Sequence, residues 1–147
     1  MSTPVQLLLG EAQSDAAHLI RQRLAGPDGA PVTVAVAAEP GAPLRALAAV
    51  DAVALHLGLL GTDDLTLVRR VRAAAPDLPL IVYAASRDSA VGRRALAAGA
   101  DVFLPRAAVY GALARTLRAL GVVPGGRPTL TALRAFLTPL GGAVHRD

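Results

Sequence analysis

His56 is the polar residue at the end of an apolar run, A-V-A-L-H. A glycine-containing turn follows it, and then two acidic residues, Asp63 and Asp64. Such a run predicts a buried strand, and the residue that closes it lies at the carboxyl end of that strand. Open α/β sheets bind ligands and react at those ends. An imidazole there could take up a proton, ligate a metal or accept a phosphoryl group. His56 is therefore the first candidate for chemistry in this chain.

Other kinds of site find little support in the sequence. There is no cysteine, which excludes disulfides, thiolate catalysis and cysteine-ligated metals. Glu11 and His56 would give zinc two ligands, fewer than a stable site needs, and the spacing of His18 and His145 does not complete the set. No serine lies in a G-x-S-x-G elbow, and no glycine-rich phosphate loop follows the first apolar run. We expect no metal, no cofactor and no enzymatic activity.

Composition indicates one globular domain in a chain of 147 residues. All 15 basic residues are arginine, and with 11 acidic residues they give a formal net charge of +4. The arginines are spread along the chain and the aromatic residues are few, which makes a nucleic-acid partner unlikely on sequence grounds. The start of the chain resembles neither a signal peptide nor a membrane span, so we expect a cytoplasmic protein without a membrane partner.

Strand-like and helix-like runs alternate from end to end, which predicts a parallel sheet with helices on both faces. The predicted strands are Val5–Leu9, Val32–Ala37, Ala52–Leu57, Leu80–Ala84 and Asp101–Leu104. The predicted helices are one capped by Ser14, Pro40–Val50, one that begins near Asp63, Asp88–Ala98 and Ala107–Leu120. This pattern alone is compatible with several strand orders.

The last 27 residues, 121–147, form a separate predicted region. They begin with a linker rich in glycine and proline and continue into a short amphipathic stretch, Thr129–Leu140. A domain without disulfides or a bound metal usually needs about 40 residues to fold alone. We therefore divide the chain into a domain of residues 1–120 and a tail that packs on that domain or on a partner.

Two segments resemble the receiver domain of two-component response regulators. The stretch Ala95–Arg106, A-L-A-A-G-A-D-V-F-L-P-R, is similar to the receiver pattern A-L-x-A-G-A-x-x-Y/F-L-x-K-P. The frame around His56 is similar to the strand and loop that carry the receiver's phospho-acceptor. The resemblance covers Val5–Leu120 and implies an α/β, flavodoxin-like fold, a doubly wound five-stranded parallel sheet of order 2-1-3-4-5.

The resemblance also implies a degenerate phosphorylation pocket. His56 stands where receivers carry the acceptor aspartate, and Ala12, after Glu11, replaces a metal-binding acidic residue. Ala84 replaces the hydroxyl residue that closes the fourth strand. Arg106 stands for the lysine that contacts the phosphoryl group. Most of the charged groups that drive phosphoryl transfer are therefore missing.

Two further positions of that pocket follow from the resemblance. Gly58 can still lend its backbone carbonyl to a metal, and Ala107 replaces a proline that normally follows a cis bond, which is costly before any other residue. One carboxylate beside an imidazole predicts no tight magnesium site. We expect His56 to be partly buried and paired with Glu11 or with the surroundings of Arg106. Phosphorylation on its nitrogen and a pH switch remain alternatives.

The resemblance implies a switch and an interaction face as well. Phe103 stands at the receiver's switch aromatic, where the methyl group of Ala84 leaves room for an inward ring, and a plain core phenylalanine is the alternative. The face formed by the fourth helix, fifth strand and fifth helix would bind a protein partner or a second copy. Its charged residues are Arg93, Arg94, Asp101, Arg115 and Arg118.

Our leading hypothesis is a receiver-like signalling domain that has lost the usual phosphorylation and serves as a protein-interaction module. A second is a phosphorelay receiver with an unusual acceptor, His56 or Asp63. A third is a small-ligand-binding flavodoxin-like domain. A fourth is a fragment of a longer DNA-binding regulator, indicated by a weak similarity of Leu137-Thr138-Pro139 to the start of a helix-turn-helix motif.

Overall fold

Five parallel strands form one sheet in the computed structural model, which describes residues 5–25, 32–39, 45–60, 65–85 and 89–122. The strands are β1 (Val5–Gly10), β2 (Val32–Ala37), β3 (Ala52–His56), β4 (Leu80–Ala84) and β5 (Val102–Pro105). Their order in the sheet is β2-β1-β3-β4-β5, so the predicted flavodoxin-like topology is confirmed.

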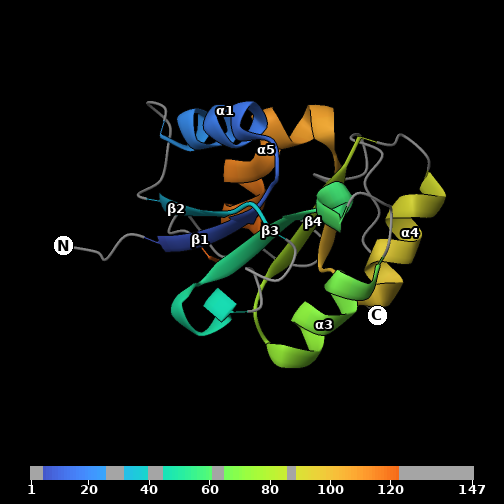
Figure 1. The fold of residues 1–147 in the computed structure, drawn as a ribbon. Helices are drawn as coiled ribbons and strands as arrows, with labels where there is room; N and C mark the ends of the chain where they lie inside the picture. Colours follow the sequence, from blue (N-terminus) through green and yellow to red (C-terminus); the bar gives the residue numbers. More distant parts are fainter. Residues whose placement is uncertain (1–4, 26–31, 40–44, 61–64, 86–88, 123–147) are drawn as a thin grey trace.

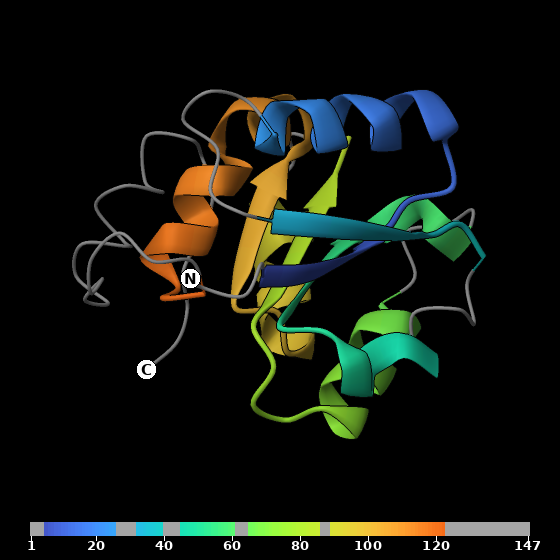
Figure 2. The same ribbon diagram turned by 90° about the vertical axis from the view of Figure 1, so that its left-hand side faces the viewer.

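Helices cover both faces of this sheet (Figures 1 and 2). On one face lie α1 (Ser14–Leu24) and α5 (Arg106–Ala119), and on the other lie α3 (Thr66–Ala74) and α4 (Ser89–Ala98). Two short 3-10 turns, Leu47–Ala49 and Leu57–Leu60, flank β3 in the sequence. The doubly wound arrangement explains why β1, β3, β4 and β5 are continuous apolar runs, because both faces of these strands are buried, whereas the edge strand β2 is partly exposed.

Some predicted boundaries differ from the structure. Ser14 is the first residue of α1 rather than its cap, since Gln13 holds the cap position without a side-chain hydrogen bond. The third helix begins at Thr66, and Asp63 lies outside the described residues. Of the predicted helix Pro40–Val50, the described part is a short helical stretch that ends in the 3-10 turn Leu47–Ala49. The stretch Thr129–Leu140 also lies outside the described residues.

Alternation along the strands sends side chains to two hydrophobic clusters, one on each side of the sheet. Leu7 and Leu9 of β1 pack with Ile20 of α1 and Leu113 of α5. Leu8, between them, belongs to the cluster under α3 and α4. The register brings the carboxyl ends of the strands to one edge of the sheet, where the positions that could carry chemistry meet.

At the opposite edge, Arg72 of α3 ties several turns together. Its guanidinium donates to the backbone carbonyl of Gly99 at 2.8 Å and to the carboxylate of Asp101 at 2.8 Å. Asp101 also accepts from the backbone N–H of Leu80 at 2.9 Å. Further bonds from the Arg72 guanidinium reach the carbonyls of the turn that follows α3, at Ala75, Pro76 and Leu78.

Gly99 is required at this contact for two reasons. Its φ of +126° lies in a region that side chains with a Cβ rarely adopt. A Cβ at this position would also lie 2.8 Å from the Cβ of Arg72. Gly99 therefore both ends α4 and lets α3 approach that end.

Within the described residues, no helix is both long enough and apolar enough to cross a membrane.

Replacing Arg72 by alanine should destabilise the domain by about 2–3 kcal/mol, because one change removes several charge-assisted hydrogen bonds, among them the one to the Asp101 carboxylate. The free energy of unfolding from urea titration measures this effect. The matched control is Arg70→Ala on the exposed side of the same helix, which should change stability by less than about 0.5 kcal/mol. Equal effects of the two variants would contradict the structural role of Arg72.

Candidate functional site

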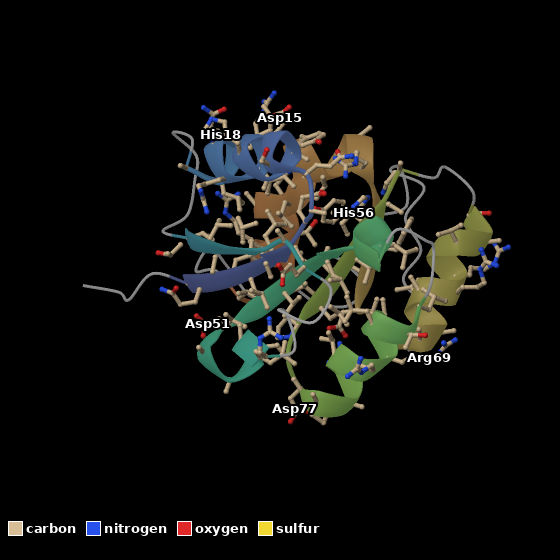
Figure 3. The ribbon with its side chains drawn as sticks, in the orientation of Figure 1. Asp15, His18, Asp51, His56, Arg69 and Asp77 are labelled. Atoms are coloured by element: carbon tan, nitrogen blue, oxygen red, sulfur yellow. The ribbon has the colours of Figure 1, made fainter. Side chains whose placement is uncertain are left out.

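Four strand ends bring together one polar cluster on the α1 and α5 side of the sheet. Glu11 follows β1, His56 closes β3, and Arg106 opens α5 directly after β5. Tyr83 lies on β4 next to His56 in the sheet register. Figure 3 shows His56 at the carboxyl end of β3. We call these four residues the polar cluster.

Glu11 is the centre of the polar cluster and is only 1% exposed. Its Oε1 accepts a hydrogen bond from the Tyr83 hydroxyl at 2.7 Å and another from Nη2 of Arg106 at 2.9 Å. Its Oε2 accepts from the backbone N–H of Gln13 at 3.2 Å and lies 3.4 Å from Nδ1 of His56. A buried carboxylate is costly unless it is paired and hydrogen-bonded, and both of these oxygens have partners.

His56 is partly buried and lies between charged neighbours, as its sequence context predicts. Nη2 of Arg106 lies 3.1 Å from its Nε2, and the imidazole ring stacks on the Tyr83 ring with centroids 5.1 Å apart. With Nδ1–H directed at Glu11, Nε2 is free to accept from Arg106. That tautomer satisfies both contacts without a charge on the imidazole.

Arg106 reaches further than its contacts with Glu11 and His56. Its Nη1 donates to the Tyr110 hydroxyl at 3.0 Å, one turn along α5. The guanidinium carbon lies 5.8 Å from the centroid of the Tyr83 ring, within the range of a cation–π contact. These contacts fix the guanidinium in the pocket rather than in solvent.

Proton affinities in the polar cluster reflect this arrangement. Burial alone would raise the pKa of Glu11, but hydrogen bonds from His56, Tyr83 and the Gln13 N–H outweigh it and lower that pKa from 4.5 to about 2. Burial and the Glu11 carboxylate raise the pKa of Tyr83. Burial disfavours the charged guanidinium of Arg106, yet the Tyr110 contact and the charge of Glu11 leave its pKa raised. At neutral pH the cluster therefore holds a Glu11–Arg106 ion pair.

Magnesium does not fit this donor set. The ion prefers oxygen ligands in octahedral order, usually with carboxylates free to bind it. Here both oxygens of Glu11 already accept hydrogen bonds, Ala12 offers a methyl group, and the Arg106 guanidinium lies 2.9 Å from the carboxylate. Among the described residues, no group of three or more histidine, cysteine or acidic side chains could hold a metal ion.

The other predicted pocket residues take different places. Gly58 lies against the imidazole, since a Cβ there would be 3.1 Å from Cε1 of His56. Ala84 is buried in the cluster on the α3 and α4 side, away from the polar cluster. Ala12 is exposed. The described residues contain no cis peptide bond, so the peptide before Ala107 is trans.

Tyr83 is the member of the polar cluster that the sequence did not reveal. It lies in a continuous apolar run and is fully buried, so it resembles an ordinary core aromatic. Its hydroxyl nevertheless binds Glu11 and its ring supports His56. One signal was present, because a tyrosine directly before the end of a parallel strand can direct its hydroxyl to the edge where sites form.

Phe103 points inward and packs against α4. It is 4% exposed, and Gly92 of α4 lies so close that an added Cβ would be 2.9 Å from Cδ2 of the ring. Ala84 belongs to the same buried cluster. The inward position of the Phe103 ring agrees with the expectation that the methyl group of Ala84 leaves room for it. The absence of a side chain at Gly92 provides the notch in which the ring lies.

The residues of the predicted interaction face take different places, and its role as an interface stays a prediction. Arg93 and Arg94 are exposed on α4, Arg115 is exposed on α5, and Arg118 of α5 is half-buried. Asp101 is half-buried and accepts hydrogen bonds from Arg72 and the backbone of Leu80 at the other edge of the sheet. Its carboxylate serves the fold at that edge.

Comparison with known proteins identifies the fold. No family model matches the sequence, and no curated protein matches it. Among solved structures, the RcsB response regulator of Salmonella typhimurium is similar with a TM-score of 0.72 and 17% identity, over 93% of this chain and 68% of that chain. A LuxR-family two-component response regulator from Aurantimonas gives a TM-score of 0.70 and 18% identity, over 93% of this chain and 97% of the other.

A third similar structure is the response regulator receiver protein from Pseudoalteromonas atlantica, with a TM-score of 0.65 and 22% identity. That match covers 77% of this chain and 93% of the other. The structural neighbours are thus receiver domains of response regulators, and the fold of this chain is the receiver fold. At these identities the likeness concerns the fold alone.

The stability of the domain should fall as the pH is lowered from about 4.5 toward 2, in part through Glu11. The folded-state pKa lies below the unfolded value, so the stabilisation is complete above that window and is lost as the carboxylate protonates. The full effect is on the order of 3 kcal/mol. Urea titrations at a series of pH values measure it.

Two variants isolate the contribution of Glu11. Glu11→Gln should lower stability at neutral pH, because Arg106 loses its anion, and should show a shallower fall in acid. Asp77→Asn, at an exposed carboxylate, should keep the wild-type slope. A Glu11→Gln curve that runs parallel to wild type throughout the acid range would show that Glu11 is not the coupled group.

Gly92→Ala should destabilise the domain by about 1 kcal/mol. Overpacking against the Phe103 ring costs about 1–3 kcal/mol, and the higher helix propensity of alanine offsets about 1 kcal/mol of that cost. Thermal or urea unfolding measures the net effect. Combining it with Phe103→Leu tests the cause, since the smaller side chain should make the alanine neutral or stabilising. A Gly92→Ala domain more stable than wild type would mean that the ring can leave its notch freely.

Proposed function

We propose that this chain is a receiver-like signalling domain that is not phosphorylated by the usual route and serves as a protein-interaction module in two-component signal transduction. The receiver fold supports a role in two-component signal transduction. The observation that supports the loss of phosphorylation is the position of Arg106. Its guanidinium binds the buried Glu11 carboxylate at 2.9 Å and approaches Nε2 of His56 at 3.1 Å. A fixed side-chain cation lies where phosphoryl transfer would need a metal ion held by free carboxylates.

The chemistry of phosphoryl transfer explains why this arrangement is unfavourable. Such transfer depends on positioning the nucleophile and on neutralising charge that develops on the phosphoryl oxygens. His56 offers a nitrogen nucleophile, but its Nδ1 is directed at Glu11 and its Nε2 at Arg106. Ala84 contributes no hydroxyl and faces the other side of the sheet. Charge stabilisation would rest on Arg106, which Glu11 already neutralises.

An interaction role follows from a domain held in one state. Phe103 lies inward in its notch beside Gly92 and Ala84, which supports a single arrangement of the α4–β5–α5 face. That face would bind a protein partner or a second copy of the chain through the exposed Arg93, Arg94 and Arg115. The proposed role includes no enzymatic activity, and its proposed setting is the cytoplasm.

Incubation with a radiolabelled small phosphodonor and magnesium tests the proposal. Wild-type protein should take up no label, because the polar cluster offers neither a free carboxylate nucleophile nor a metal site. The matched control introduces the residue types of the receiver pattern with Ala12→Asp, His56→Asp, Ala84→Thr and Arg106→Lys together. Circular dichroism verifies its folding, and the folded variant should acquire label that is lost in mild alkali, as acyl phosphates are.

Stable label on the wild-type protein that disappears in His56→Ala would overturn the proposal in favour of a histidine acceptor. Light scattering over a range of concentrations, with and without the phosphodonor, supplies a second readout. The oligomeric state should be indifferent to the donor. A donor-dependent change in molecular mass would also contradict a domain held in one state.

A further inference from the structure

The helices α3 and α4 lie next to each other on one face of the sheet (Figures 1 and 2). Both helices carry exposed arginines. Arg69 and Arg70 are exposed on α3, and Arg93 and Arg94 are exposed on α4. Arg69 lies one turn before Arg72, whose guanidinium reaches Gly99 at the end of α4, so Arg69 is on the side of α3 that faces α4. We call these four exposed residues the arginine face.

The arginine face differs from the other arginine sites because its charges are not used within the described part of the chain. Arg72 binds Asp101 and Arg106 binds Glu11, each at less than 3 Å. By contrast, the Arg93 guanidinium contacts the Ser89 hydroxyl at 3.2 Å, and within the described ranges the side chains of Arg69, Arg70 and Arg94 have no hydrogen bond or ion pair. Their guanidinium groups therefore remain available to a partner.

No acidic side chain interrupts this surface on the two helices. The other exposed residues of α3 and α4 are small and uncharged, namely Thr66, Ala73, Ala74, Ser89 and Ala97. Asp77 lies beyond the C-terminal end of α3, away from Arg69 (Figure 3). On α1, in contrast, Asp15 shares the exposed side with Arg21 and His18. Small side chains between guanidinium groups allow a partner's backbone to approach closely.

We propose that the arginine face docks an acidic protein segment, whose carboxylates pair with Arg69, Arg70, Arg93 and Arg94. The planar guanidinium fork matches a carboxylate in bidentate geometry. Exposed ion pairs are individually weak, so the binding depends on several pairs formed together and weakens as salt is added. This surface is separate from the polar cluster and does not depend on whether the domain is phosphorylated.

A phosphate backbone is the competing ligand, and the described surface favours carboxylates. Nucleic-acid binding that persists at physiological salt commonly uses about 6–10 phosphate contacts, more than one patch of four arginines supplies. Single strands are usually held by stacking on exposed aromatic rings. Phe103 and Tyr83 are buried, and neither α3 nor α4 carries an aromatic residue.

Fluorescence anisotropy with a labelled, helix-forming Glu/Ala peptide of about 20 residues, carrying glutamates at i, i+4 spacing, tests the proposal. Wild-type protein should bind this peptide at low ionic strength and should not bind the same peptide with glutamine in place of glutamate. The double variant Arg70→Glu and Arg94→Glu, one change on each helix, should weaken binding by about tenfold or more, because each change replaces attraction by repulsion.

A charge-matched control separates this face from net charge alone. Arg23→Glu with Arg45→Glu changes the net charge equally at exposed positions on other elements, and it should weaken binding by less than about twofold. Equal losses in the two double variants, or no binding by the wild type at low salt, would overturn the proposal. Tighter binding of a DNA duplex that depends on Arg70 and Arg94 would assign the face to nucleic acid instead. None of these outcomes bears on phosphorylation.

Discussion

A carboxylate removed from water must be neutralised, and the carboxyl edge of this sheet is organised around that requirement. Glu11 is almost completely buried, yet donors reach it from β4, from the start of α5 and from the backbone at the start of α1. Each donor comes from a different part of the sequence, so the ion pair forms only when the strands are correctly ordered. The polar cluster therefore links strand order to a single arrangement of the edge.

The same edge shows that a fold leaves the chemistry of its strand ends open. Parallel strands bring their carboxyl ends together whatever residues stand there, because topology and not side-chain chemistry decides which positions meet. In this chain those positions hold a histidine, a tyrosine and an arginine around one acid. A site rich in free carboxylates would attract a divalent cation, whereas this site has internal charge balance.

Much of the fold and part of the site could be predicted from the sequence. The apolar runs predicted the strands, whereas the strand order and the grouping of Glu11, His56 and Arg106 came from the resemblance to receivers. Tyr83 was not singled out, because its position near a strand end is a weak signal and a buried tyrosine in an apolar run resembles an ordinary core aromatic. The sequence also does not reveal that Arg72 reaches Asp101 in the turn after α4, because that contact joins residues far apart in the chain.

The Arg72 contacts have a consequence for recognition on the neighbouring surface. They join the end of α3, the turn before β4 and the turn before β5, so that α3 and α4 are held in one mutual orientation. A partner that spans both helices then meets a preformed pattern of guanidinium groups, and little backbone entropy is lost when the complex forms. The hydrogen bonds of Arg72, far from the polar cluster, would thereby reduce the entropy that such a partner loses on binding and so increase its affinity.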